Sequence, residues 1–165
     1  MDTSVFKEFT TNINTVDKLN ELLTDASEAE TTSFASSAKH LSASIKGKVS
    51  KKFEEIIRNL EERNELPKSP EERSKFFEGL KEYLQKLPRI SLELAFNPTE
   101  KFVNKISNFL KEGSDNTPIL DIQVKPNILA GTTIEKDGVF KDYSYTTRLD
   151  QILKQKYSQR TNENV

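Results

Sequence analysis

Asp142 and Ser144 are the residues of this chain whose types and spacing first suggest chemistry, because a serine near a carboxylate is part of many hydrolase sites. A nucleophilic serine also needs a base, and the sequence has one histidine, His40. The positions within one helical turn of His40 contain no acidic residue to orient its ring. We therefore interpret Asp142 and Ser144 as local hydrogen-bonding groups at the entry to a helix. A small hydrolase that uses them is the weaker hypothesis.

The other polar residues do not have the spacing of a metal site, a phosphate-binding loop or an acid–base pair. The chain has no cysteine, which excludes a Cys-based zinc site and a thiol nucleophile. Glutamates come in adjacent pairs, but neighbouring helical positions point about 100° apart and do not converge on one substrate. Asp137-Gly138 lacks the other ligands of a calcium loop, and Ala130-Gly131 lacks the further glycines and the lysine of a phosphate loop. We predict no catalytic residue, no metal site and no cofactor.

The overall charge argues against a general nucleic-acid binder. Lys and Arg number 25 and Asp and Glu 26, for a net charge of -1, whereas such proteins are clearly basic. No apolar run approaches the roughly 18 residues of a membrane-spanning helix, and MDTSVFKEFT does not look like a secretory signal. Only 34% of the 165 residues are hydrophobic, so we expect small cores rather than one large core.

Helical periodicity dominates the first half of the chain. It predicts helices over about 15–27 and 50–65, and a third that begins with Ser69 as its cap and ends before Pro88. A helix through 34–45 is possible, and partial disorder of residues 1–45 is an equally open alternative. The predicted helix over 50–65 has an apolar face. We interpret this face first as part of the core and, as an alternative, as a groove that binds a partner. The face consists of Phe53, Ile56, Ile57 and Leu60.

From residue 90 onward, apolar residues recur every 2 residues, as in a strand, instead of every 3.6 residues, as in a helix. Alternating apolar residues predict strands at 90–96, 120–124, 128–136 and 139–145, with a helix opened by Asn97-Pro98 between the first two. A final helix is predicted over 147–158. The fold class is therefore α+β, a helical N-terminal part followed by a small β-α-β-β-β-α part. We divide the chain into a helical part (1–66), a connecting helix (67–89), an α/β part (90–158) and a tail (159–165).

The segment VKPNILAGTTIEKDGVFKDYSYTTRLDQILKQ resembles the C-terminal signature of the δ subunit of F-type ATP synthase, the oligomycin-sensitivity-conferring protein family. The matching positions include Ala130, Gly131, Asp142, Ser144, Arg148 and Leu149. We expect these positions to be structural, with Arg148 pairing with Asp142. The resemblance covers about residues 50–158. The chain departs from the family in a missing Tyr-Ala-x-Ala-Leu opening helix and in Tyr145, which replaces a basic residue. The helical portion before residue 66 is also short for the six-helix bundle of the family, so we expect a divergent member with a shortened N-terminal part.

The resemblance implies a non-catalytic stator subunit that joins the catalytic head to the peripheral stalk and resists rotation during proton-driven ATP synthesis. It implies contacts with the α subunits through the N-terminal helices and with the b-type stalk through the C-terminal part. Nucleic acid, direct membrane contact and homo-oligomers are not expected. The expected location is the cytoplasmic face of the bacterial inner membrane. The alternative is a stand-alone α+β adaptor that binds unrelated helices.

Overall fold

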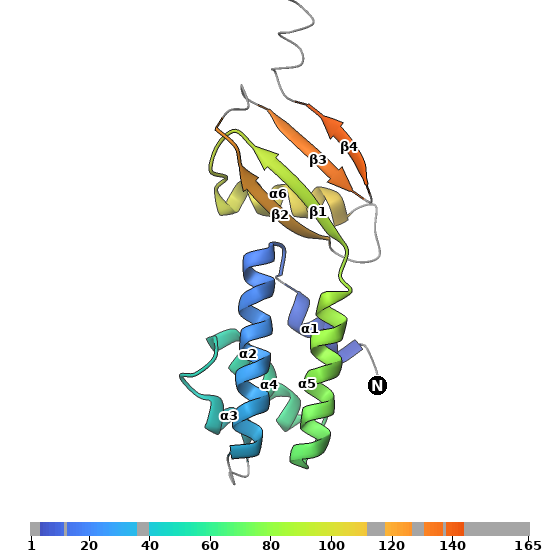
Figure 1. Cartoon of the computed structure of the whole chain (residues 1–165). Coiled ribbons are helices and arrows are strands. Elements are labelled where there is room, and N and C mark those ends of the chain that lie inside the picture. The colour runs from blue at the N-terminus through green and yellow to red at the C-terminus, as the bar shows by residue number, and fades with distance from the viewer. Residues whose placement is uncertain are drawn as a thin grey trace, which may run out of the picture. The chain divides into compact units, whose positions relative to one another are not determined.

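The computed structural model describes residues 4–11, 13–35, 40–111, 118–126, 131–136 and 138–143 (Figure 1). The chain divides into two compact units, Met1–Leu87 and Pro88–Val165. The first is helical and the second contains a sheet, which confirms the predicted α+β class. The prediction separated residues 67–89 as a connecting helix, whereas helix α5 (Pro70–Gln85) lies within the first unit and packs against α2 (Val16–Ala35).

The helical unit begins with a helix that the sequence patterns did not predict, α1 (Ser4–Thr10). Helix α2 extends past the predicted end at residue 27 to Ala35. Hydroxyl groups in its second half donate to carbonyls one turn back: Thr24 to Asn20 at 2.9 Å and Thr31 to Ser27 at 2.9 Å. These bonds keep polar side chains compatible with the helix, so the Ser/Thr-rich sequence does not end it.

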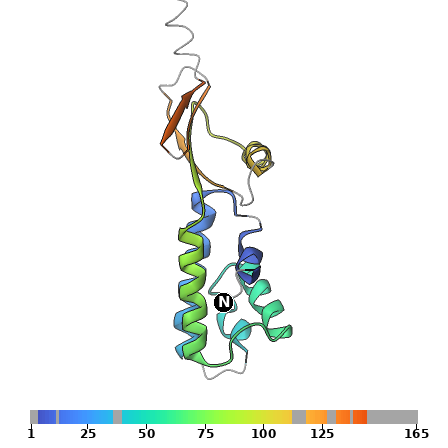
Figure 2. The ribbon, with the colours of Figure 1, turned by 90° about the vertical axis from the view of Figure 1, so that its right-hand side faces the viewer.

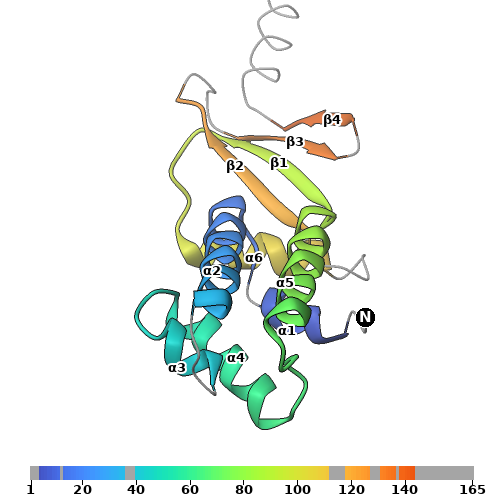
Figure 3. The same cartoon turned by 60° about the horizontal axis from the view of Figure 1, so that its bottom comes forward.

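Helix α4 (Lys51–Glu62) has Ser50 as its cap, and α5 begins at the predicted cap, Ser69. The Ser50 hydroxyl accepts from the Phe53 amide at 3.3 Å, and the Ser69 hydroxyl accepts from the Glu72 amide at 3.2 Å. Pro70 follows Ser69 at the first helical position, which a proline tolerates because that amide needs no intrahelical partner. The short helix α3 (Leu41–Ile45) contacts both α2 and α4 (Figure 3).

Aromatic side chains fill the core of the helical unit. Phe53 lies with its ring centroid 5.4 Å from that of Phe9 and 6.5 Å from that of Phe77, and Phe76 meets Phe6 edge-to-face at 5.3 Å. Aromatic pairs at these separations add to the free energy of burial. These phenylalanines come from three helices, α1, α4 and α5, and pack together with buried aliphatic side chains in the core of the unit.

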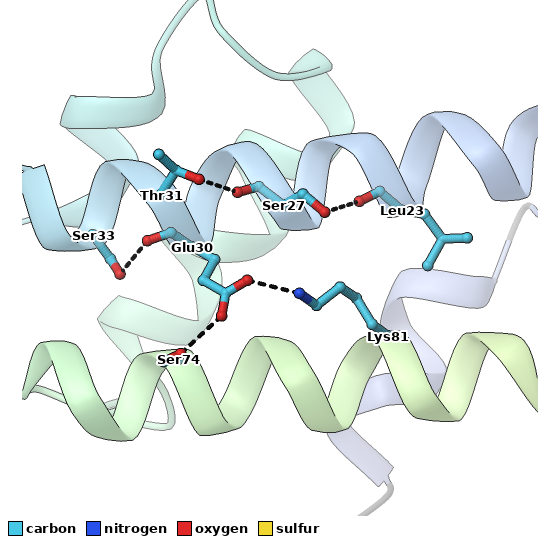
Figure 4. Close-up of polar contacts among 7 residues, drawn as sticks. All are labelled: Leu23, Ser27, Glu30, Thr31, Ser33, Ser74 and Lys81. Atoms are coloured by element: carbon cyan, nitrogen blue, oxygen red, sulfur yellow. Dashed lines mark hydrogen bonds and ion pairs between the residues drawn. The ribbon is translucent and has the colours of Figure 1, made fainter.

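Glu30 joins the two long helices of this unit. Its carboxylate accepts from Lys81 at 2.7 Å and from the Ser74 hydroxyl at 2.8 Å, both on α5 (Figure 4). Burial by itself raises the pKa of Glu30, but the hydrogen bonds from Lys81 and Ser74 and the charge of Lys81 outweigh it and hold the pKa below its ordinary value.

The second unit is a four-stranded sheet of order β2-β1-β3-β4 with one described helix, α6 (Glu100–Lys111), on one face (Figure 2). The strands are β1 (Arg89–Leu94), β2 (Ile119–Val124), β3 (Thr132–Lys136) and β4 (Val139–Asp142). β1 pairs in parallel with β2 and antiparallel with β3. The core of this unit consists of Ile90, Leu92, Val103 and Leu120 with partly buried Ile106, Leu110, Ile122 and Ile134.

The element order β-α-β-β-β was predicted; β1 ends two residues earlier than expected, whereas β2 begins one residue earlier than expected. The predicted strand over 128–136 begins at Thr132, and its residues 128–130 lie outside the described part. The predicted helix over 147–158 and the tail also lie outside it.

Candidate partner-binding site

The helical unit contains a pocket of about 380 Å³ between α1, α2 and α4. Its apolar lining combines buried Phe9, Leu22 and Phe53 with half-buried Ile13 and Ile56. The polar lining consists of Lys18, Glu21, Asp25, Ser50 and Lys52. An apolar hollow with a charged rim suits an apolar side chain whose neighbours are polar.

A buried carboxylate fixes the wall of this pocket. Asp25 is 7% exposed, and it accepts from the Ser50 amide at 3.1 Å and from the Ser50 hydroxyl at 2.5 Å. Ser50 is also the cap of α4. Asp25 therefore attaches the start of α4 to the middle of α2, and this attachment sets how far apart the walls stand.

Two lysines, Lys18 and Lys52, lie near each other on the pocket lining. The pKa of Lys52 is lowered, because partial burial disfavours its charged form and the Lys18 ammonium repels it. An acidic group arriving between these lysines would relieve that repulsion. The lining also carries Glu21 and Asp25, so its rim presents charges of both signs.

The four predicted partner-binding residues on α4 separate into two classes. Ile57 and Leu60 are 0% exposed and pack inside the unit. Phe53 is 1% exposed and forms the floor of the pocket, while Ile56 is half-buried at its wall. A partner can reach Ile56 directly, and it reaches Phe53 only through the pocket.

The contributions of α1 and α2 to this pocket were not predicted from the sequence. Phe6, Phe9 and Ile13 are spaced i, i+3 and i+7, a helical signal that was present. Leu22 was assigned to a helix but not to a site. Nothing in the linear pattern indicates that Asp25 meets Ser50, because 25 residues separate them.

The family-motif positions are only partly described. Gly131 has φ +117, a backbone conformation that favours glycine, and Asp142 is exposed on β4. Ala130, Ser144, Arg148 and Leu149 lie outside the described residues. The expected pairing of Asp142 with Arg148 and the hydrolase hypothesis for Ser144 therefore stay predictions.

His40 is exposed, and its Nδ1 lies 3.8 Å from Glu61 of α4. That carboxylate is occupied as an acceptor for the Leu41 amide and the Ser42 hydroxyl, each at 2.5 Å. Among the described residues, no group of three or more His, Asp or Glu side chains is placed to hold a metal ion. Nor is any helix in the described ranges long and apolar enough to cross a bilayer.

Comparison with known families gives one match, and it covers residues 3–155 of the chain. The family model is that of the ATP synthase delta (OSCP) subunit. A comparison with curated proteins finds no match. Members of the family are non-catalytic stator subunits that belong to the peripheral stalk of F-type ATP synthase and serve ATP synthesis as part of the complex. With a helical unit whose core contains packed phenylalanine rings, a second unit with a small mixed sheet and a match over residues 3–155, the chain belongs to the ATP synthase delta (OSCP) subunit family.

Proposed function

We propose that this chain links the catalytic head of the ATP synthase to the b-type stalk and keeps the head from turning with the rotor. The pocket between α1, α2 and α4 is the observation that carries this proposal. A clamp needs apolar recesses for partner helices and complementary charge, and it needs no nucleophile or metal.

The partner at the pocket is an amphipathic helix of an α subunit. One of its large apolar side chains enters between Phe9, Leu22 and Phe53, and Ile56 packs beside it. Because the walls are already joined by the Asp25–Ser50 hydrogen bonds, little ordering is needed on binding. Preorganisation of this kind supports a long-lived contact, which a stator requires.

The test is binding of a synthetic peptide, the N-terminal segment of the α subunit of the same organism, to the full chain by calorimetry. Ile56→Glu places a charge on the pocket wall and is expected to weaken binding at least tenfold. Asn59→Glu adds the same charge to an exposed position of α4 that does not line the pocket, and it should bind like the unchanged chain. Equal binding by both variants would contradict docking at this pocket.

The b-type stalk is the second proposed partner, held by the sheet-containing unit. The complex would place the chain at the cytoplasmic face of a bacterial inner membrane, without membrane contact of its own. Family membership over residues 3–155 argues against the alternative of an adaptor with a chance resemblance. Co-purification of the chain with α and b-type subunits from native membranes tests the whole assignment.

A further inference from the structure

Lys52 combines an accessible position with surroundings that disfavour a positive charge. It is an exposed residue in the first turn of α4, and its side chain borders the pocket between α1, α2 and α4. Lys48, Lys81 and Lys86 of the same unit each lie within ion-pair distance of a carboxylate. Lys52 has no such partner among the described residues, so its amine is not engaged by another side chain.

Three features favour the neutral form of the Lys52 amine. Part of the side chain is buried against the pocket, and the Lys18 ammonium repels a second positive charge; both lower the pKa of Lys52. The first turn of α4 adds the positive end of the helix dipole, which disfavours a cation. A lysine beside apolar surface or another cation is a better nucleophile, because its neutral amine has a free electron pair.

The other charged groups around the pocket do not reverse this effect. Asp25 of α2 lines the pocket, but its carboxylate is occupied by hydrogen bonds from the start of α4. Among the described residues, neither Glu21 of α2 nor Glu55 of α4 forms an ion pair with Lys52. Glu54 of α4 is engaged by an arginine one turn further on, and α1 contributes apolar side chains to the lining.

The pocket indicates which electrophiles reach this amine. Its floor is apolar, so a short acyl chain can be buried there while its carbonyl group lies at the rim beside Lys52. The Lys18 ammonium on the same rim favours a leaving group with negative charge. An acyl phosphate has all three parts: an apolar chain, an activated carbonyl and a phosphate leaving group.

We propose that Lys52 is an acylation site that takes short acyl chains from acyl phosphates and holds them in the pocket. The neutral Nζ attacks the carbonyl carbon, a C–N bond forms, and the C–O bond to phosphate breaks. The phosphate leaves with the electron pair of that bond, and the nitrogen gives up one proton to solvent. The product is an uncharged amide. Its consequence rests on the proposed function: an acylated pocket and a docked α-subunit helix exclude each other.

The experiment incubates the full chain with acetyl phosphate or butyryl phosphate and quantifies acylation of each lysine by mass spectrometry of its peptides. Lys51 is the matched control, because it is exposed in the same helical turn but does not line the pocket. Lys52 should react roughly threefold faster than Lys51 or more, with a larger ratio for the butyryl chain. Equal rates at the two lysines, or a ratio that does not grow with chain length, would overturn the proposal.

Variants of Lys18 test the contribution of charge. Lys18→Met removes the ammonium and keeps an unbranched side chain, so the pKa of Lys52 should rise and its rate–pH profile should move to higher pH. Lys18→Glu should move the profile further, whereas the profile of Lys51 should change less. If the profile of Lys52 stays in place in both variants, and circular dichroism shows both to be folded, Lys18 does not activate the amine.

Protection by the partner separates this site from the stator function. The α-subunit peptide should slow acylation of Lys52 but not that of Lys75, an exposed lysine of α5. Selective acylation of Lys52 without protection would leave the acylation site standing and contradict docking at the pocket. Protection by the peptide, with Lys52 no faster than Lys51 in the free chain, would leave the docking standing and overturn the acylation site.

Discussion

Glu30 shows how one carboxylate can hold two helices while staying partly hydrated. Its side chain is 18% exposed, and it bonds both Lys81 and Ser74 of α5. Glu30→Gln removes the charge but keeps the size, so we expect a loss of about 1 kcal/mol in the free energy of unfolding at pH 7. Urea denaturation measures it. Glu55→Gln, at an exposed position of α4, is the control and should change stability little.

The same carboxylate makes a pH-dependent prediction. The pKa of Glu30 is lower in the folded chain than its ordinary value of about 4.3. The stabilisation it provides is therefore present above about pH 4.3 and is lost as the pH falls through the folded pKa. Denaturation curves of the unchanged chain and of Glu30→Gln should converge in acid. A difference that stays constant between pH 7 and pH 3 would contradict the assignment.

Asp25 acts at the residue scale on the geometry of the pocket. Asp25→Ala leaves the half-buried Ser50 amide without its acceptor, so we expect a loss of about 1 to 2 kcal/mol in the free energy of unfolding. Asp25→Asn keeps an oxygen that can accept from that amide and should cost less. Thermal or urea unfolding distinguishes the two variants. If they are equally stable, the carbonyl oxygen at this position is not what holds α4 to α2.

At the scale of elements, α3 depends on a neighbouring helix for its start. It is five residues long, and its cap residue, His40, provides no side-chain hydrogen bond. Glu61 of α4 supplies the acceptor for the Leu41 amide and the Ser42 hydroxyl instead. A helix this short has no stability of its own, because the cost of starting it is not recovered. Its existence is thus a property of the α3–α4 pair.

Glu61→Ala should therefore release α3 selectively. Loss of about 1 to 2 kcal/mol corresponds to roughly five- to thirtyfold faster amide hydrogen exchange in residues 41–45, while α5 keeps its protection. Glu62→Ala alters the adjacent, exposed glutamate and is the matched control. Unchanged exchange in α3 after Glu61→Ala would show that its packing against α2 suffices.

The sequence predicted some helices better than others, because only some of them have a periodic face of large apolar residues. α4 and α5 each have a serine cap and a periodic apolar face, and the two helices were predicted. α1 has only seven residues, too few for a periodic apolar face, and no helix was predicted there despite its two buried phenylalanines. The second half of α2 buries alanines, Ala26 and Ala29, rather than large residues. Close packing of small side chains gives little hydrophobic signal, so its length was underestimated.

The candidate site was predictable only on the helix that supplies its floor. Phe53 and Ile56 belonged to the apolar face identified on α4, whereas Ile57 and Leu60 of the same face are fully buried. The position of a residue along α4 does not show whether its side chain lines the pocket or is fully buried. That difference depends on where α1 and α2 lie against α4. The contacts of Asp25 with Ser50 join distant parts of the chain, and such contacts follow from packing rather than from local pattern.

At the scale of the whole molecule, the two compact units have separate cores. Among the described residues, phenylalanines and aliphatic side chains form the core of the unit Met1–Leu87, and aliphatic side chains between the sheet and α6 form the core of the unit Pro88–Val165. A subunit that holds one partner with each unit can lose one contact without losing the other. Separate cores also mean that a cavity in one should leave the other folded.

Phe77→Ala tests this separation in the full chain. The Phe77 side chain is 0% exposed and contacts Phe53 and Phe76, so its removal should cost about 3 to 5 kcal/mol in the helical unit. Amide hydrogen exchange should then accelerate in α2, α4 and α5 but not in β1 and β2. Leu92→Ala, 2% exposed in the other core, should give the reverse pattern. Equal acceleration in both units with either variant would mean that the chain unfolds as one cooperative body, and the two proposed docking sites would then be energetically coupled.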